Sequence, residues 1–470
     1  MNRTAVGAAC LPWGIPIAYP LLGMGLAAHD FARGVQLALL LLASTCWAWH
    51  GTRVQLRQNS RWSTLIVSGT LVVLVSASTL LSAYPTIALR ELLIFVGLWA
   101  WAQTMANAMA NTQTRRAVLR TLVLGAMAHS VLVLLLLAVS VLEGNLSEPW
   151  AALVGFDNPR FLNHAQTVAL PLVAIVSADD SSKRWRQLAW ATLVLGGMLL
   201  FITYGRATLL ALLLGLLAGL WAFGRRGLPY ARRTVPPTIV GMLLMWVCYL
   251  LWFRPAGYVI DPDQFAHVHY RDYLIGQAVK LWQTSPWLGV GPMHFSHWYN
   301  GEAAHPHDLY FQLLAEYGAP ATILILLGAG RWFAASLRAL RTLPEQHTNV
   351  GVGLWGALIG IAVDAAFSGN FVMPVSQLWI AMAIAMVLAM RADKRTNAAP
   401  ASGIATSSTW SRARGGLPWL VVAAMLWMTV QSYREVLHSS QPTLGTSGAV
   451  HAAHGETTNP NPRFWIIGWF

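Results

Sequence analysis

The chain has 470 residues, of which 56% are hydrophobic and only 10% are charged. A soluble globular protein carries about 25% charged residues, so this composition excludes a water-soluble fold of this size. The mean hydropathy of +0.51 and the net charge of +13 indicate a membrane protein with basic loops rather than a nucleic-acid-binding protein.

Apolar segments recur along the whole chain and predict an all-α, polytopic bundle of about 12 transmembrane helices, or 13 if residues 417–433 also span. The other predicted spans are residues 9–29, 35–50, 63–82, 87–109, 121–142, 164–178, 187–204, 207–224, 238–253, 309–330, 351–369 and 375–391. We therefore expect a transmembrane catalytic domain at 1–391, a cytoplasmic linker rich in Ala, Ser and Thr at 392–416, and a last span with its tail at 417–470.

Basic residues cluster in every second loop. The clusters lie at residues 53–61, 115–120, 183–186, 225–233, 331–341 and 391–395. With a cytoplasmic N-terminus they all fall on the cytoplasmic side, as the positive-inside rule requires. The rule does not explain the cations on the outer side, which are therefore candidates for binding an anion. These are Arg33, Arg160, Arg206, Arg254, Arg271, Lys280, Arg434 and Arg463.

The longest outer connection is the loop at 254–308. Its residues 271–282 combine apolar side chains with Gln277 and Lys280, which predicts an amphipathic helix lying in the membrane interface. Six of the chain's 14 histidines also lie in this loop. Its pairs His267 and His269, and His305 and His307, resemble zinc ligands in spacing. The chain has no H-E-x-x-H motif or paired acidic ligand near them, so we predict no metal and no cofactor.

His307 lies at the start of a long apolar helix. Asp308 is a good N-cap for that helix, so His307 sits at its positive end. That position favours a neutral imidazole, able to accept a proton, and also favours a bound phosphate. Glu316 follows His307 by nine residues, about two and a half turns, and should face the other way in a packing role. We predict substrate contacts at Arg160, Asn163, His305 and Asp308, beside the two outer arginines Arg206 and Arg271.

Residues 307–318 resemble the His-Asn-x-x-x-Gln-x-x-x-Glu-x-Gly signature of the O-antigen ligase and polymerase superfamily. Gly205-Arg206-Ala207 is similar to the Ser-Arg-Gly turn of that family, and Arg271 with residues 285–292 is similar to its Arg and Pro-x-x-Gly-x-Gly loop. The resemblance covers roughly residues 150–390. Asp308 replaces the usual Asn, and Tyr204-Gly205 stands where Ser is usual.

The resemblance implies a multi-pass glycosyltransferase of the bacterial inner membrane with its active site facing the periplasm. Such an enzyme moves a glycan from undecaprenyl pyrophosphate to an acceptor, with inversion and without a metal. It implies that His307 is the general base, and that Arg206 and Arg271 bind the pyrophosphate and stabilise it as leaving group.

The resemblance is shared by enzymes that use three different acceptors. We expect an O-antigen ligase, whose acceptor is lipid A-core oligosaccharide in lipopolysaccharide biosynthesis. A protein O-oligosaccharyltransferase acting on a pilin-type protein and an O-antigen polymerase are the alternatives. The apolar residues 464–470 could rest on the membrane or help to hold an acceptor. A transporter of the lipid-linked glycan would need polar residues along the whole path, whereas here the unexplained polar residues gather on the outer side.

Overall fold

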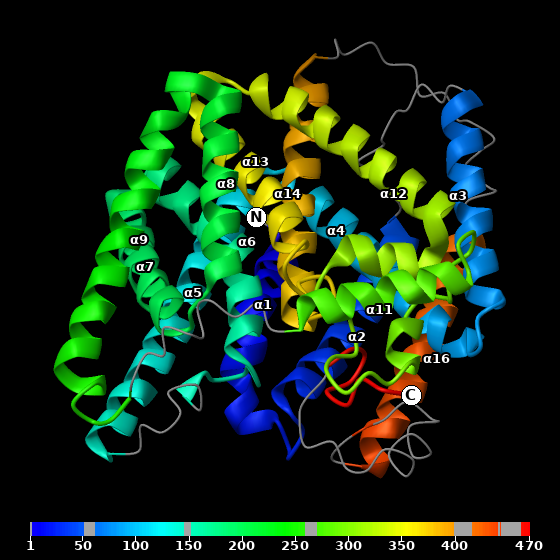
Figure 1. The fold of residues 1–470 in the computed structure, drawn as a ribbon. Helices are drawn as coiled ribbons and strands as arrows, with labels where there is room; N and C mark the ends of the chain where they lie inside the picture. The colour runs from blue at the N-terminus through cyan, green and yellow to red at the C-terminus, as the bar shows by residue number, and fades with distance from the viewer. Residues whose placement is uncertain are drawn as a thin grey trace.

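The computed structural model describes residues 2–50, 62–144, 152–258, 270–398, 416–439, 442 and 462–470. The α-helices are α1 (Arg3–Leu22), α2 (Ala28–His50), α3 (Trp62–Leu80), α4 (Pro85–Met109), α5 (Thr112–Leu142), α6 (Pro159–Asp179), α7 (Lys183–Ile202), α8 (Arg206–Phe223), α9 (Leu228–Cys248), α11 (Arg271–Thr284), α12 (Leu309–Arg341), α13 (Thr348–Asp364), α14 (Pro374–Ala398) and α16 (Gly416–His438). The short helices are the 3-10 turns η2 (Gly224–Gly227), η4 (His294–His297) and η5 (Glu345–His347) and the π-helix η3 (Tyr249–Phe253). The prediction of an all-α polytopic bundle is confirmed (Figure 1).

Each predicted span overlaps a helix. Within the described residues, nine segments are long and apolar enough to cross a membrane, and one of them, Arg206–Phe253, contains both α8 and α9. Three predicted spans correspond to α3, α13 and α16, which are not among the nine. α14 continues to Ala398, into the segment that the sequence predicts as a linker.

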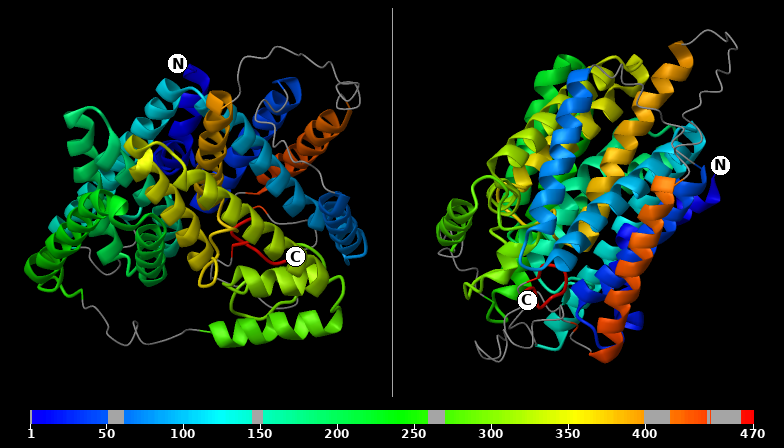
Figure 2. Two further views of the ribbon diagram at one scale, coloured as in Figure 1. Left: turned by 90° about the horizontal axis from the view of Figure 1, so that it is seen from above. Right: turned by 90° about the vertical axis from the view of Figure 1, so that its right-hand side faces the viewer.

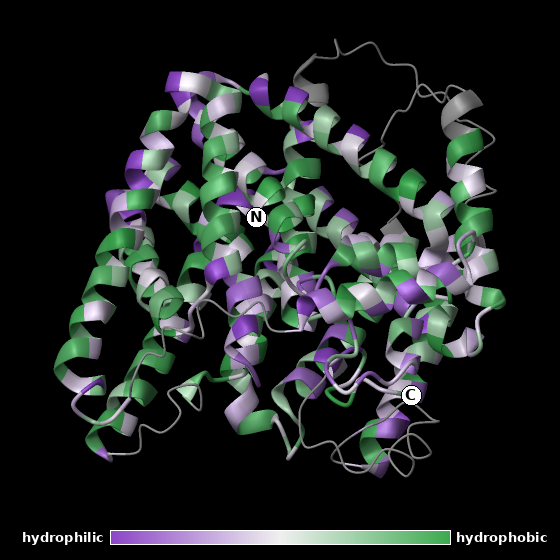
Figure 3. Ribbon diagram, viewed as in Figure 1, coloured by the Kyte–Doolittle hydropathy of each residue, from purple (hydrophilic) through white to green (hydrophobic). Residues whose placement is uncertain are grey.

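The helices α6 and α14 form the centre of the bundle, and most of their residues are buried. α8 packs against α13, α7 against α9, α14 against α4 and α16 against α2. The α8–α13 contact depends on glycine, because a Cβ on Gly215 would lie 2.3 Å from the carbonyl oxygen of Gly356. Figure 3 shows apolar residues along the outward lengths of α8 and α9, as expected of surfaces that face lipid.

The basic clusters and the start of α6 lie at opposite ends of the bundle. Ion pairs from Arg120 to Asp180 at 2.8 Å and from His347 to Asp179 at 3.8 Å bring the start of α5, the end of α6 and the start of α13 together. α8 and α12 also end in basic segments, at residues 225–226 and 338–341. The first residues of α6, α8 and α12 are therefore gathered at the other end.

α12 is broken at Gly318, whose φ of 75° and ψ of 170° are not helical. A Cβ there would lie 2.5 Å from the carbonyl carbon of Trp287, so only glycine fits without a shift. The turn after α11 is fastened to the break by three backbone hydrogen bonds. They run from Val290 to Ala315 at 2.9 Å, from Gly291 to Glu316 at 3.0 Å and from Ala319 to Pro286 at 2.9 Å.

The tail, residues 462–470, runs into the body of the molecule (Figure 2). Phe464, Trp465, Trp469 and Phe470 are each at most 1% exposed. The expectation that residues 464–470 could rest on the membrane is therefore wrong, because these side chains are enclosed by protein. The helix predicted at residues 271–282 is confirmed, since α11 runs from Arg271 to Thr284.

Candidate active site

A cavity of about 590 Å³ lies at the end of the bundle where α6, α8 and α12 begin. Six of the seven predicted site residues line it, although they come from four separate regions of the chain. These six are Arg160, Asn163, Arg206, Arg271, His305 and His307. The seventh, Asp308, is not part of the lining.

Four helices start at this cavity, and the N-terminus of each carries a partial positive charge. They begin at Pro159 (α6), Arg206 (α8), Arg271 (α11) and Leu309 (α12). Asp308 caps α12 as predicted, by accepting hydrogen bonds from the amides of Tyr310 and Phe311, and Asn158 caps α6. Among the described residues, no side chain caps α8 or α11, which leaves their first turns suited to an anion.

Backbone strain is concentrated beside the same helix starts. Five non-glycine residues in the described part of the chain have a positive φ, and Tyr204, Tyr270 and His307 among them line the cavity. Their φ angles are 50°, 53° and 53°. Such angles are uncommon for side chains of this size and are typical of functional sites. Each one turns the chain just before a helix that begins at the cavity.

Three arginines give the cavity a positive character. Arg160 and Arg206 are exposed, whereas Arg271 is half-buried and donates from Nη2 to the carbonyl oxygen of Phe367 at 2.8 Å. Burial, followed by the charges of Arg160 and Arg206, lowers the pKa of Arg271. Among the described residues, no carboxylate forms an ion pair with Arg160 or Arg271. The cavity therefore holds closely spaced positive charge that an anionic ligand would neutralise.

His307 stands beside these arginines. Its backbone nitrogen donates to Nδ1 of His305 at 3.2 Å, and the two ring centroids are 4.1 Å apart. Burial, with the charges of Arg160 and Arg271 and the nearby His164, lowers the pKa of His307 to about 3. The imidazole is therefore neutral near pH 7 and can accept a proton, as the sequence suggested from the helix end alone.

Asn163 lines the cavity, but its polar groups hold the chain rather than point to an open position. Its Oδ1 accepts from the hydroxyl of Thr203 at 2.7 Å, and its carbonyl oxygen accepts from the hydroxyl of Thr208 at 3.0 Å. A Cβ on Gly205 would lie 3.0 Å from the same Oδ1. Asn163 thus fastens the turn that presents Arg206 to the start of α6.

His164 also lines the cavity, although no pattern in the sequence distinguishes it from the other histidines. Its Nδ1 lies 3.4 Å from Oδ2 of Asp364, a carboxylate with no exposed surface. An acid inside a predicted span is a signal for a functional position, because an isolated charge there is costly. Only the folded chain shows which histidine it approaches.

The other loop histidines have structural partners. His294 Nε2 accepts from the amide of Tyr84 at 3.0 Å, and His297 Nδ1 is 2.8 Å from the backbone oxygen of Phe470. His267 and His269 lie outside the described residues. In the part of the chain that the structure describes, no group of three or more His, Cys, Asp or Glu side chains is arranged to hold a metal ion.

Arg463 and Arg33, two of the outer cations predicted as candidate anion ligands, do not line the cavity. Arg463 Nη2 lies 2.7–3.0 Å from the carboxylate oxygens of Glu91 and Glu316. Arg33 donates to the carbonyl oxygens of Val372 and Phe464. Both guanidinium groups therefore bind partners inside the protein. Glu316 does not line the cavity, but it belongs to this buried ion cluster rather than to an apolar packing contact.

Residues 191–326 match the family model described as O-Antigen ligase. The matched segment contains Arg206, Arg271 and His307 at the cavity. Over this segment the chain is similar to the O-antigen ligase family. This match confirms the resemblance seen in the sequence, and the matched family is one of glycosyltransferase-like enzymes. No curated protein matches the chain at a significant level.

Proposed function

We propose that this protein is an O-antigen ligase of the bacterial inner membrane, with the cavity opening on the periplasmic side. It transfers polysaccharide from undecaprenyl pyrophosphate to lipid A-core oligosaccharide. The observation that carries the proposal is the position of a neutral His307 beside Arg160 and Arg271, where α8 and α11 begin with no side-chain cap among the described residues. This site combines a base with a receptor for an anion.

The pyrophosphate of the donor fits the positive half of the cavity. Arg206 and Arg271 are the first residues of α8 and α11, so each brings a guanidinium and a helix N-terminus to the same place. A guanidinium can donate two parallel hydrogen bonds to a phosphate, and the first-turn amides add further donors. Arg160, from α6, adds a third charge.

In the proposed reaction, His307 removes the proton from an acceptor hydroxyl as its oxygen attacks the anomeric carbon of the donor glycan. The new C–O bond forms while the bond to the pyrophosphate oxygen breaks, and undecaprenyl pyrophosphate leaves with the electron pair. The arginines stabilise the charge that develops on the leaving group. Direct displacement inverts the anomeric configuration, and the step requires no metal.

The acceptor decides between related activities, so the test varies it. Purified protein would be given an undecaprenyl-pyrophosphate-linked glycan with lipid A-core, with a pilin-like protein, or with no added acceptor, each with and without chelator. A glycan ladder on lipid A-core that survives chelation supports the ligase. Glycosylated protein would assign an O-oligosaccharyltransferase, and growth of the donor alone would assign a polymerase. No product with any acceptor would contradict glycan transfer and favour a transporter.

A further inference from the structure

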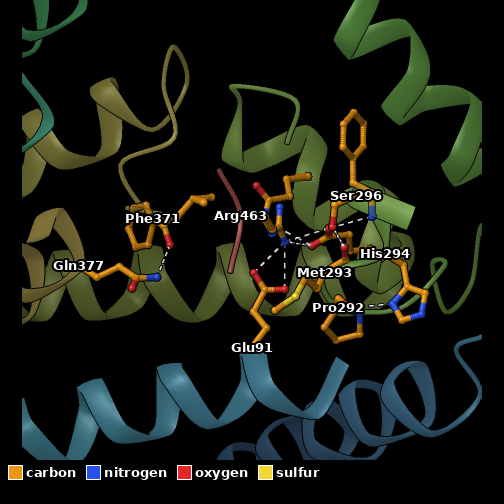
Figure 4. Close-up of polar contacts among 12 residues, drawn as sticks. Glu91, Pro292, Met293, His294, Ser296, Phe371, Gln377 and Arg463 are labelled. Carbon is orange, nitrogen blue, oxygen red and sulfur yellow. Dashed lines mark hydrogen bonds and ion pairs between the residues drawn. The ribbon is translucent and has the colours of Figure 1, made fainter. Parts of the chain in front are cut away.

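The tail enters the protein through an unusual ion cluster. Figure 4 shows Arg463 reaching toward Glu91, which projects from α4. The same Nη2 atom contacts Glu316 of α12 at 2.8 and 2.9 Å. Arg463 and Glu316 are 2% and 0% exposed, so the cluster is sealed from solvent. The two carboxylates raise the pKa of Arg463.

Further contacts hold the rest of the tail. Its backbone oxygens at Arg463 and Phe464 accept from Arg33, its Ile466 amide donates to Asp30, and the Trp465 indole donates to Glu435. Its last backbone oxygen lies 2.8 Å from His297. These partners belong to α2, α16 and η4. The tail therefore joins helices that are far apart in the sequence.

The ion cluster is connected to the cavity through Phe295. Glu316 Oε1 accepts from the amide of Phe295 at 3.1 Å. The Phe295 side chain is 1% exposed and belongs to a small core that joins α11 to α12. That core consists of Leu274, Ala278, Leu281, Phe295, Ala303 and Ala315. Leu274 and Ala303 also line the cavity, so the small core forms part of its wall.

A second connection runs through Arg33. This residue donates to the tail and also to the carbonyl oxygen of Val372, in the loop between α13 and α14. The same loop contains Phe367, whose carbonyl oxygen accepts from Arg271. Pro462, the first described residue of the tail, lines the cavity directly. The tail thus lines the cavity itself, and it is linked through Arg33 to the loop that accepts a hydrogen bond from Arg271.

We propose that Arg463 is a positioning residue for glycan transfer: by joining Glu91 and Glu316 it holds Phe295, and through it the start of α11 and the loop before His307, in the reactive arrangement. The inference rests on the proposed function. Arg463 does not touch the substrate in this account. It fixes the spacing between the base on one loop and the arginine on the neighbouring helix.

The physical basis is the cost of buried like charges. Without Arg463, Glu91 and Glu316 would face each other in an enclosed site and would have to separate or become protonated. Separation breaks the hydrogen bond that Glu316 accepts from the amide of Phe295, and protonation of Glu316 weakens it because the acceptor loses its charge. A displacement of about 1 Å at a reactive centre can reduce turnover on the order of 100-fold even when the mutation lies far from the chemistry.

The test compares Arg463→Met and Arg463→Lys with wild type. The matched control is Arg434→Met, which removes an exposed cation of α16 outside the cavity lining. We expect Arg463→Met to lower kcat on the order of 100-fold while the dissociation constant for undecaprenyl pyrophosphate stays within about threefold, because the arginines of the cavity remain. Arg463→Lys keeps the charge and should recover part of kcat. A folded Arg463→Met with wild-type kcat would overturn the proposal, as would parallel losses of kcat and donor binding that follow the folded fraction.

If Arg463→Met does not fold, the charge-balanced double variant Glu91→Gln/Arg463→Met replaces it and should still show reduced kcat with retained donor binding. Hydrogen–deuterium exchange provides a measurement independent of activity, and exchange at residues 270–307 should be faster in this variant than in Arg434→Met. Unchanged exchange would contradict the positioning role. If wild type itself forms no product, the proposed function fails, and the exchange result still decides whether the tail holds these residues.

Discussion

The backbone amide of His307 donates to Nδ1 of His305, so one histidine of this pair fixes the main chain that carries the other. Because Nδ1 accepts, the proton of neutral His305 is on Nε2. His305 is 2% exposed and lies against Gly369, where a Cβ would be 2.5 Å from its Cε1 atom. The pair thus consists of a rigid support and a base that faces the cavity.

Replacing His307 by alanine should reduce kcat by about 10²–10⁴-fold, the usual contribution of a general base. The assay is initial-rate glycan transfer with purified protein. His438→Ala provides the matched control, since His438 is exposed at the end of α16 and outside the cavity lining. Wild-type turnover by a folded His307→Ala protein would rule out His307 as the base.

The pH dependence of kcat/KM reports the pKa of His307 in the free enzyme, and that of kcat reports its pKa in the donor complex, so the two profiles should differ. The lowered pKa of His307, about 3, keeps the base neutral as the pH falls through 6.5, so kcat/KM should stay constant there and fall only near pH 3. Bound pyrophosphate neutralises the arginines and raises the pKa of His307, so kcat should begin to fall at a higher pH than kcat/KM. Coincident acid limbs would show that the donor does not bind beside His307.

Removing an arginine of the cavity should weaken the stabilisation of the leaving group. We expect Arg206→Ala and Arg271→Ala each to reduce kcat/KM by about 10²–10³-fold. The kcat/KM of Arg206→Lys should lie between those of wild type and Arg206→Ala, because an ammonium group keeps the charge but lacks the planar, two-pronged donor geometry of a guanidinium. Arg254→Ala, which removes an exposed outer cation away from the cavity, should match wild type. Equal losses in Arg254→Ala would point to a general charge effect.

Gly318→Ala should destabilise the protein by about 1–3 kcal/mol from its backbone angles, with a further loss from the clash with Trp287. Gly328→Ala offers a control in the same helix, because no atom lies within 4 Å of the added Cβ. Alanine favours helix there and should leave stability unchanged or raise it by up to about 1 kcal/mol. Thermal unfolding in detergent would compare them, and equal midpoints would contradict the tight contact at Gly318.

Gly369→Ala should act on the base through its neighbour. The added methyl group would press on His305 and shift the amide of His307, so kcat should fall by about tenfold or more with little change in donor binding. Binding titrations with undecaprenyl pyrophosphate give the dissociation constant of the donor, and steady-state kinetics give kcat. Unaltered kcat would mean that His305 can move without displacing His307.

Local patterns were sufficient to predict much of this molecule. Apolar runs located the helices, and the N-cap at Asp308 followed from a preference that acts within one turn. The gathering of Arg206, Arg271 and His307 was predicted from their common outer side and from the family resemblance, and not from spacing, because these residues lie far apart in the chain.

Long-range contacts could not be predicted in the same way. Arg463 binds carboxylates that are 372 and 147 residues away, and nothing in the local sequence specifies them. The tail is apolar, which is equally typical of a membrane-surface segment and of a buried one. The packing role of Glu316 was predicted from the geometry of a straight helix. That geometry indicates the helix face on which Glu316 lies, but not that Arg463 forms an ion pair with it.

The break at Gly318 also affects how the site responds to its membrane. Two of the three hydrogen bonds from the turn after α11 go to Ala315 and Glu316, before the break, so the first part of α12 is tied to that turn. A helix that crosses a bilayer tilts to match the thickness of the lipid around it. Here the tilt of the long second part of α12 can be absorbed at Gly318. The distance between His307 and Arg271 should then be the same in thin and thick bilayers, which insulates turnover from lipid composition.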